Sequence, residues 1–228
     1  MNSVLLMACG GPMQSWGTRS RFEIRDTERE PSKSGIIGLV ASALGRNRKD
    51  SIADLASLHM GVRADREGIM KKDFQTVQQV AVASGGTPSN LVSTRHYLSD
   101  AVFLVGLEGD HALLSDIHHA MKHPKRPLFL GRKSFVPSIP FFLSDGLMTG
   151  INLDRAFQEY PPLVQSFNKK ENAKDSTFEP MRVVIETDEK THAVRKDQPI
   201  SFDLKDRRFR DRYVRIHQVI PRLQGGGE

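Results

Sequence analysis

The sequence has little of the chemistry that defines several large classes of protein. It holds a single cysteine, Cys9, which excludes a disulfide framework and a zinc site of several cysteines within one chain. No stretch approaches the roughly 18 apolar residues that a membrane-spanning helix needs, and residues 1–10 lack the basic start of a signal peptide. We therefore expect a cytoplasmic protein with no membrane partner, in which Cys9 is a buried small hydrophobic residue.

Motifs of hydrolytic and nucleotide-dependent enzymes are also absent. The sequence has no Gly-x-Ser-x-Gly, no glycine-spaced phosphate loop and no His-Glu-x-x-His zinc pattern. We predict neither a metal nor a cofactor. Metal-free RNA cleavage needs only a base, an acid and a cation, so Arg95, His96 and Tyr97 leave that activity open.

The charge balance favours a polyanionic partner. The 228 residues hold 33 Lys and Arg against 27 Asp and Glu, which gives a net charge of +6. A basic balance is typical of nucleic-acid binding, although many soluble proteins have a similar charge. The length suits one large domain.

Hydrophobic periodicity predicts an α+β domain. Residues 4–9 form a continuous apolar run, which is typical of a central strand buried on both faces. Residues 36–44 have helical spacing, with Ser32 or Ser34 able to cap the start and Gly45 able to close the end. The remaining pattern predicts helices at 51–59 and 112–122 and strands at 61–66, 101–107, 181–186 and within 205–218. This order resembles a ferredoxin-like or RNA-recognition-type core.

A long hairpin is predicted within this core. Residues 74–82 and 91–97 both suit extended structure, and the turn-forming segment 84–90 separates them. The hairpin contains little that could pack on both faces. We therefore expect it to protrude as an arm.

Several polar segments could hold RNA. Lys33, Ser34 and Gly35 stand at a helix start, where unpaired N–H groups favour a phosphate, although a plain capped helix explains them too. Arg132, Lys133 and Ser134 follow a glycine, which suits a phosphate or a base edge as well as an exposed turn. Trp16, with Gln14 and Ser15, could stack on a base or belong to the core. Further contacts are possible from Arg46, Arg48, Arg95 and Tyr97.

Taken together and in order, six segments resemble the CasD subunits of the Cascade surveillance complex of type I-E CRISPR systems, members of the RAMP superfamily. No single segment is specific, but the ordered set is, and it runs nearly the whole chain. The segments are MQSWG (13–17), PSKSGIIGL (31–39), TVQ (76–78), RHYLSDA (95–101), LGRKS (130–134) and RDRYVR (210–215).

The resemblance implies a modified ferredoxin-like, RNA-recognition-motif palm with a protruding β-hairpin thumb. One palm domain would span 1–228, with the thumb inserted at 67–100 and with 150–228 completing the palm. Lys33 and Ser34 would hold phosphates of the crRNA 5′ handle, with Gln14, Ser15 and Trp16 nearby. Arg132, Lys133 and Ser134 would line the same groove, and Arg46 and Arg48 would lie at its rim. The tip of the thumb and residues 168–176 have no clear counterpart in the family.

The resemblance also implies partners. The thumb would reach the backbone, CasC-type subunit, and the chain would touch the large, CasA-type subunit and meet target DNA only indirectly, through the complex. We thus expect a non-catalytic subunit that caps the 5′ handle in antiviral defence. A metal-independent endoribonuclease acting on the CRISPR repeat is the alternative, because a related type I-C branch cuts RNA through tyrosine, lysine and histidine. A third hypothesis is a protein-only scaffold.

Overall fold

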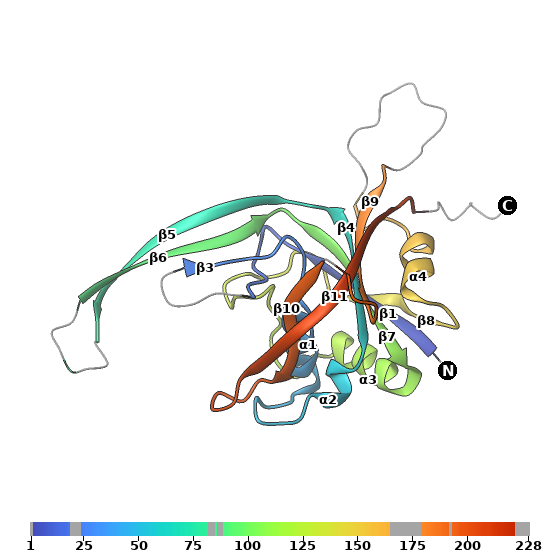
Figure 1. Cartoon of the computed structure of the whole chain (residues 1–228), viewed down its shortest axis with the longest axis horizontal. Helices are drawn as coiled ribbons and strands as arrows, with labels where there is room; N and C mark the ends of the chain where they lie inside the picture. Colours follow the sequence, from blue (N-terminus) through green and yellow to red (C-terminus); the bar gives the residue numbers. More distant parts are fainter. Residues whose placement is uncertain are drawn as a thin grey trace, which may run out of the picture.

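The computed structural model describes residues 2–18, 24–81, 85, 89–164, 179–191 and 193–221. It confirms the predicted α+β class with a ferredoxin-like palm and a protruding hairpin (Figure 1). Among the described residues, no helix has the length and apolar character to cross a membrane.

The palm is built on a βαββαβ unit. Its sheet order is β8-β1-β7-β4 with every neighbouring pair antiparallel, which is the ferredoxin-like arrangement. The unit consists of β1 (Asn2–Gly10), α1 (Lys33–Leu44), β4 (His59–Arg66), β7 (Val102–Asp110), α3 (His111–Lys122) and β8 (Phe142–Thr149). Beyond β4 the sheet continues to seven strands through β9 (Met181–Thr187), β11 (Arg208–Val219) and β10 (Val194–Ser201).

Strand β1 is buried on both faces, as its apolar run predicts. Leu5 and Met7 belong to the larger core cluster, which includes side chains of α1 and α3. Val4 and Leu6 point the other way, into a smaller cluster with α4 (Leu153–Glu159). Alternate residues of a strand face opposite sides of a sheet, so a strand covered on both sides needs apolar residues throughout. Cys9 lies in the larger cluster, and burial raises the pKa of its thiol far above the ordinary value.

The predicted helix at 36–44 is confirmed with one more turn at its start. The Ser32 hydroxyl accepts a hydrogen bond from the Gly35 N–H and caps α1. Gly45 ends the helix with a φ of 80°, a conformation that glycine adopts without strain. The predicted helix at 112–122 corresponds to α3, with Asp110 as its cap. The predicted helix at 51–59 shortens to α2 (Ala53–Ala56).

A second, smaller sheet forms the arm, which we define as strands β5 (Ile69–Val80) and β6 (Ser89–Ser99). The arm extends well beyond the palm in Figure 1. At its base β6 also pairs with β2 (Met13–Gln14) and, in parallel, with β3 (Ile24–Arg25). Most of the predicted tip at 84–90, and all of 168–176, lies outside the described residues.

Candidate nucleic-acid interface

Three segments that are distant in sequence meet where the arm joins the palm. The Ser15 N–H donates to the Leu130 carbonyl at 3.0 Å, which joins the segment after β2 to the loop 130–135. The Ser15 hydroxyl reaches the carbonyls of His96 on β6, at 3.3 Å, and of Asp26 just after β3, at 3.4 Å. We call this region the junction. It brings the predicted Ser15, Arg95, Tyr97 and Arg132 together.

Gly131 fixes how the loop meets the palm. Its φ is 91°, and a Cβ atom at this position would lie 1.7 Å from the Ser15 carbonyl oxygen. Only glycine permits such close backbone contact. The next residues, Arg132, Lys133 and Ser134, are therefore held at the base of the arm, and the last two are exposed.

An arginine cluster occupies the junction. The Arg132 guanidinium donates to the carbonyls of His96 (2.9 Å) and Arg25 (3.4 Å), and it lies 5.2 Å from the centre of the Phe135 ring. Arg25 and Arg95 are neighbours in the parallel register of β3 and β6.

This cluster carries more positive than negative charge. Burial lowers the pKa of Arg132, the charges of Arg95 and Arg25 lower it further, and Asp73 and Asp26 oppose these effects. The Arg95 Nε is buried and has no hydrogen-bond partner within the part of the chain that the structure describes. An anion placed here would relieve the repulsion among the three guanidinium groups.

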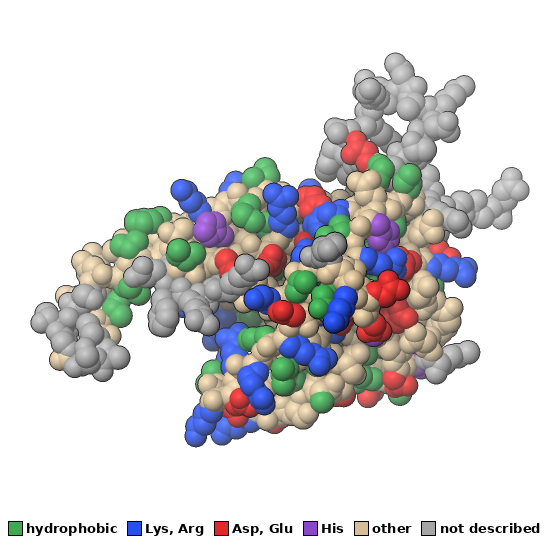
Figure 2. All heavy atoms as spheres, in the orientation of Figure 1, with side chains coloured by type: hydrophobic (Ala, Val, Ile, Leu, Met, Phe, Trp, Pro, Cys, Tyr) green, Lys and Arg blue, Asp and Glu red, His purple; other side chains and the backbone are tan. Residues whose placement is uncertain are grey.

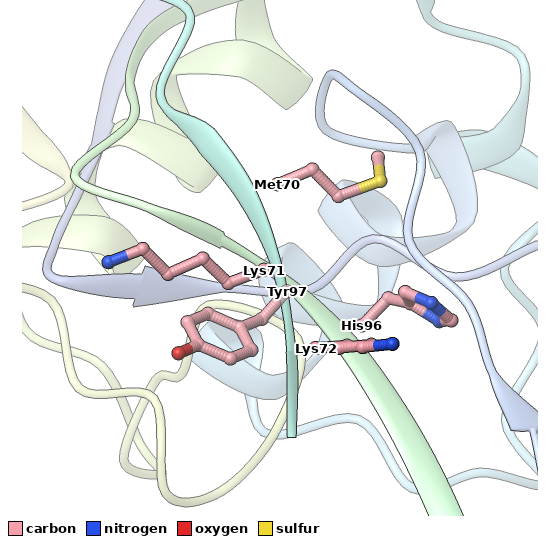
Figure 3. A pocket seen from close by; sticks show the side chains of 5 residues that line it. All are labelled: Met70, Lys71, Lys72, His96 and Tyr97. Carbon is pink, nitrogen blue, oxygen red and sulfur yellow. The ribbon is translucent and has the colours of Figure 1, made fainter. Parts of the chain in front are cut away.

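An open hollow of about 560 Å³ lies at the base of the arm, lined by Met70, Lys71, Lys72, His96 and Tyr97. Figure 3 shows Lys71 and Tyr97 pointing to one side of the hairpin, and Lys72, His96 and Met70 to the other. The register explains this, because Lys71 is opposite Tyr97 and Lys72 is opposite His96. The Tyr97 ring lies 6.1 Å from Phe135, so Tyr97 faces the arginine cluster and His96 does not.

Trp16 and Gln14 belong to the core, and the prediction that Trp16 stacks on a base is wrong. Trp16 is 1% exposed and its Nε1 donates to Gln14 Oε1 at 3.0 Å. Gln14 is fully buried and donates to the Ala101 carbonyl at 2.7 Å. The Trp16 ring covers Gly35, where a Cβ would come within 2.9 Å of it. Trp16 and Gln14 therefore support the junction from the core side.

The prediction that Lys33 holds a phosphate is also wrong. Its side chain is buried, and its Nζ lies 2.8 Å from a Glu186 carboxylate oxygen. The Lys33 backbone N–H donates to Asp197 at 2.7 Å, and the same carboxylate accepts from Arg212. The start of α1 thus already has an anion, supplied by the protein. Ser34 and Gly35, beside it, are only partly exposed.

Arg46 and Arg48 lie away from the junction. They follow the last residue of α1, and the 12-residue helix separates them from Lys33 by ~18 Å. Arg46 pairs with Asp54 at 2.5 Å, which lowers the pKa of Asp54. These arginines therefore lie at the other end of α1 from Lys33, and their predicted contact with RNA at the rim of the groove stays a prediction. Arg25 was missed, because its segment shows only mixed charge in the sequence.

A family model matches most of the chain. Residues 4–215 fit the family described as CRISPR-associated protein (Cas_Cas5). The chain belongs to this family.

Relatives of known name or structure agree with this family membership. The chain is 32% identical over 180 residues to the CRISPR system Cascade subunit CasD of Escherichia coli strain K12, which covers 72% of this chain and 79% of that protein. A solved structure described as a CRISPR RNA-guided surveillance complex contains a chain with 32% identity and a TM-score of 0.80, covering 96% of this chain and 90% of that one. Another, described as the crystal structure of a Cas protein, shows 42% identity and a TM-score of 0.74 over 95% of both chains. The resemblance to CasD-type subunits is therefore confirmed.

Proposed function

We propose that this Cas5-family chain is a crRNA-binding subunit of a Cascade-type surveillance complex and holds the 5′ handle of the guide RNA at the junction. Membership of the family and similarity to CasD support the proposal that the chain is a subunit of such a complex. The main support for the site is the convergence of Arg25, Arg95 and Arg132, together with the buried Arg95 Nε, which has no hydrogen-bond partner among the described residues. Such a cluster is costly in the free protein and is stabilised by a polyanion.

The geometry suits capture of phosphates more than reading of bases. Arg132 is held by two carbonyls and the Phe135 ring, so binding a phosphate costs it little side-chain entropy. Exposed Lys133 and Ser134 continue the donor surface along the loop. Phosphate contacts of this kind supply affinity and register, while target sequence would be read by base pairing of the guide.

The arm supplies a surface for a second subunit. Ile69, Met70, Phe74 and Val92 are between 43% and 68% exposed, and Figure 2 shows hydrophobic side chains lying open along it. Monomeric proteins rarely leave such a row uncovered. We assign the arm to the thumb predicted at 67–100 and propose that it packs on the backbone, CasC-type subunit. We also propose that the chain contacts the large, CasA-type subunit.

Substituting Arg132 with glutamine is expected to weaken binding of a labelled repeat RNA roughly 10- to 100-fold, because one charge-assisted contact is lost. The plot of log affinity against log salt should become shallower by about one unit. Fluorescence anisotropy across a salt series measures both quantities. Arg132→Lys is expected to recover only part of the affinity, since an ammonium cannot make the planar stacked contact with Phe135.

Arg155→Gln is the matched control, because Arg155 is exposed on α4, on the opposite side of the molecule from the arm (Figure 1). It removes the same charge and should leave RNA affinity nearly unchanged. Equal losses in both variants would show that net charge alone attracts the RNA. Absence of salt-dependent RNA binding by the folded chain would favour the protein-only scaffold.

The junction gives the ribonuclease alternative little support. His96 and Tyr97 point to opposite sides of the hairpin (Figure 3), so they do not face one phosphodiester together. We expect repeat RNA incubated with the chain in chelator to stay intact on a denaturing gel. Cleavage that is lost in both His96→Ala and Tyr97→Phe would overturn the non-catalytic proposal.

A further inference from the structure

A second basic surface lies at the opposite end of α1 from the junction. Segments 45–54 and 122–127 hold six Lys and Arg but only two Asp, an excess of four positive charges in a chain whose net charge is +6. The loop between α1 and α2 lies at the bottom of Figure 1, whereas the arm runs along the top. We call this surface the helix-end patch. Its exposed cations are Arg48, Lys49, Lys122, Lys125 and Arg126.

Contacts between the two segments hold the patch together. The Lys125 N–H donates to the Ala43 carbonyl at 2.9 Å, and the Lys125 stem lies against Gly45. The Arg126 guanidinium donates to the carbonyls of Gly45 and Arg46 and to the Asn47 side chain. Pro124 and Pro127 flank these two cations and restrict the loop. The charges are therefore placed by the fold and are not carried on a loose tail.

The makeup of the patch favours a phosphate backbone over a protein partner. Neither segment contributes a large exposed hydrophobic side chain, whereas the centre of a protein interface is apolar. Single-stranded nucleic acid is usually held by exposed aromatic rings. Two aromatic rings lie at the patch, and both have partners within the fold: Phe142 stacks on His118 with the Lys122 ammonium over it, and His123 packs against His119. What remains is a group of cations that can contact phosphates without reading bases.

We propose that the helix-end patch binds the phosphate backbone of double-stranded nucleic acid, independently of sequence and separately from the arginine cluster at the junction. This goes beyond the proposed function, in which RNA is held only at the junction. A Cas5-family chain would then contact a duplex directly, and not only through its partners.

The test uses the full chain with three neutralised cations, Arg48→Gln, Lys49→Gln and Lys125→Gln, in one variant. Arg126 is left unchanged because its hydrogen bonds hold the segment that follows α1. Binding of a labelled DNA duplex, an RNA duplex and the single-stranded repeat RNA is followed by anisotropy across a salt series. We expect affinity for duplex to fall roughly 30-fold or more and the salt dependence to become shallower by about two to three units. Binding of the repeat RNA should change less than about threefold.

The matched control carries Lys190→Gln, Lys196→Gln and Lys205→Gln, three exposed cations elsewhere on the chain. It should retain its affinity for duplex, and thermal melts should show both triple variants folded. A loss of duplex binding only in the patch variant supports the proposal, and the stronger of the DNA and RNA responses identifies the duplex. Unchanged duplex binding in the patch variant, equal losses in the control, or equal losses for the single strand would each overturn it. Loss of RNA binding in Arg132→Gln reports on the junction alone, so the two sites are judged separately.

Discussion

Replacing Lys33 with methionine is expected to lower the free energy of unfolding by about 3–5 kcal/mol, because it leaves the Glu186 carboxylate inside the fold without its cation. Burial lowers the pKa of Lys33 in spite of the attraction of Glu186, which indicates how strongly the site is desolvated. Denaturant unfolding measures the change. At concentrations where the variant is folded, its affinity for repeat RNA should match the parent, since the ammonium faces Glu186 and not solvent.

The double variant Lys33→Met with Glu186→Gln separates the ion pair from simple packing. The glutamine oxygen can still accept the hydrogen bond that the Met60 N–H donates to Glu186, while no charge remains buried. A large part of the lost stability should return, as expected when both members of a buried pair are neutralised. A stable Lys33→Met variant that binds RNA weakly would contradict this reading and restore Lys33 as a phosphate contact.

Lys33 also shows where prediction from the sequence ends. The cap and the apolar face of α1 depend on neighbours in sequence; the apolar face was predicted correctly, and Ser32 was one of the two predicted caps. The role of the lysine depends on Glu186 and Asp197, which lie 153 and 164 residues away. A lysine at a helix start suits a phosphate site locally, and only the tertiary fold supplies the competing carboxylates.

The elements of the fold also divide into those set by neighbouring residues and those set by tertiary contacts. Strand β1, helices α1 and α3 and the arm follow from periodicity and turn chemistry over short windows, so they were predictable. Strands β2 and β3 have two residues each and exist only because β6 lies beside them. Strand β8, half-buried and without regular alternation, and α4, with seven residues, were missed for a similar reason. Their stability comes from packing and not from local preference.

In the candidate site, Arg132 and Arg95 could be predicted from the sequence. Arg132 lies in a basic turn that follows a glycine, and Arg95 precedes His96 and Tyr97. Arg25 could not be predicted, since its neighbours carry both charges and its place beside Arg95 follows from a parallel pairing of only two residues. From the sequence, Trp16 could stack on a base or belong to the core, and its burial places it in the core. A residue type suggests what a side chain can do, and the tertiary fold determines which groups it meets.

Gly131→Ala should be the most damaging single change at the junction. A methyl group there would meet the Ser15 carbonyl oxygen at 1.7 Å, a separation that no rotamer change can relieve because backbone stands on both sides. Either the loop 130–135 or the segment after β2 must move, and the hydrogen bond from Ser15 to Leu130 breaks. We expect a loss of stability of about 2–5 kcal/mol, from left-handed strain and overpacking together. RNA affinity should fall at least as far as in Arg132→Gln, because Arg132 and Lys133 are displaced together.

The variant Gly150→Ala separates the effect of left-handed strain from the effect of overpacking. Gly150 also has a positive φ, 68°, yet a Cβ there would meet nothing within 4 Å. This variant should show only the strain of a left-handed alanine, about 1–2 kcal/mol, and should bind RNA like the parent. If the two alanine variants lose the same stability and Gly131→Ala still binds RNA normally, then close contact between the loop and Ser15 does not position the arginine cluster. If only Gly131→Ala loses RNA binding, the close backbone contact between Gly131 and Ser15 determines the position of Arg132. RNA binding at the junction then depends on this one contact.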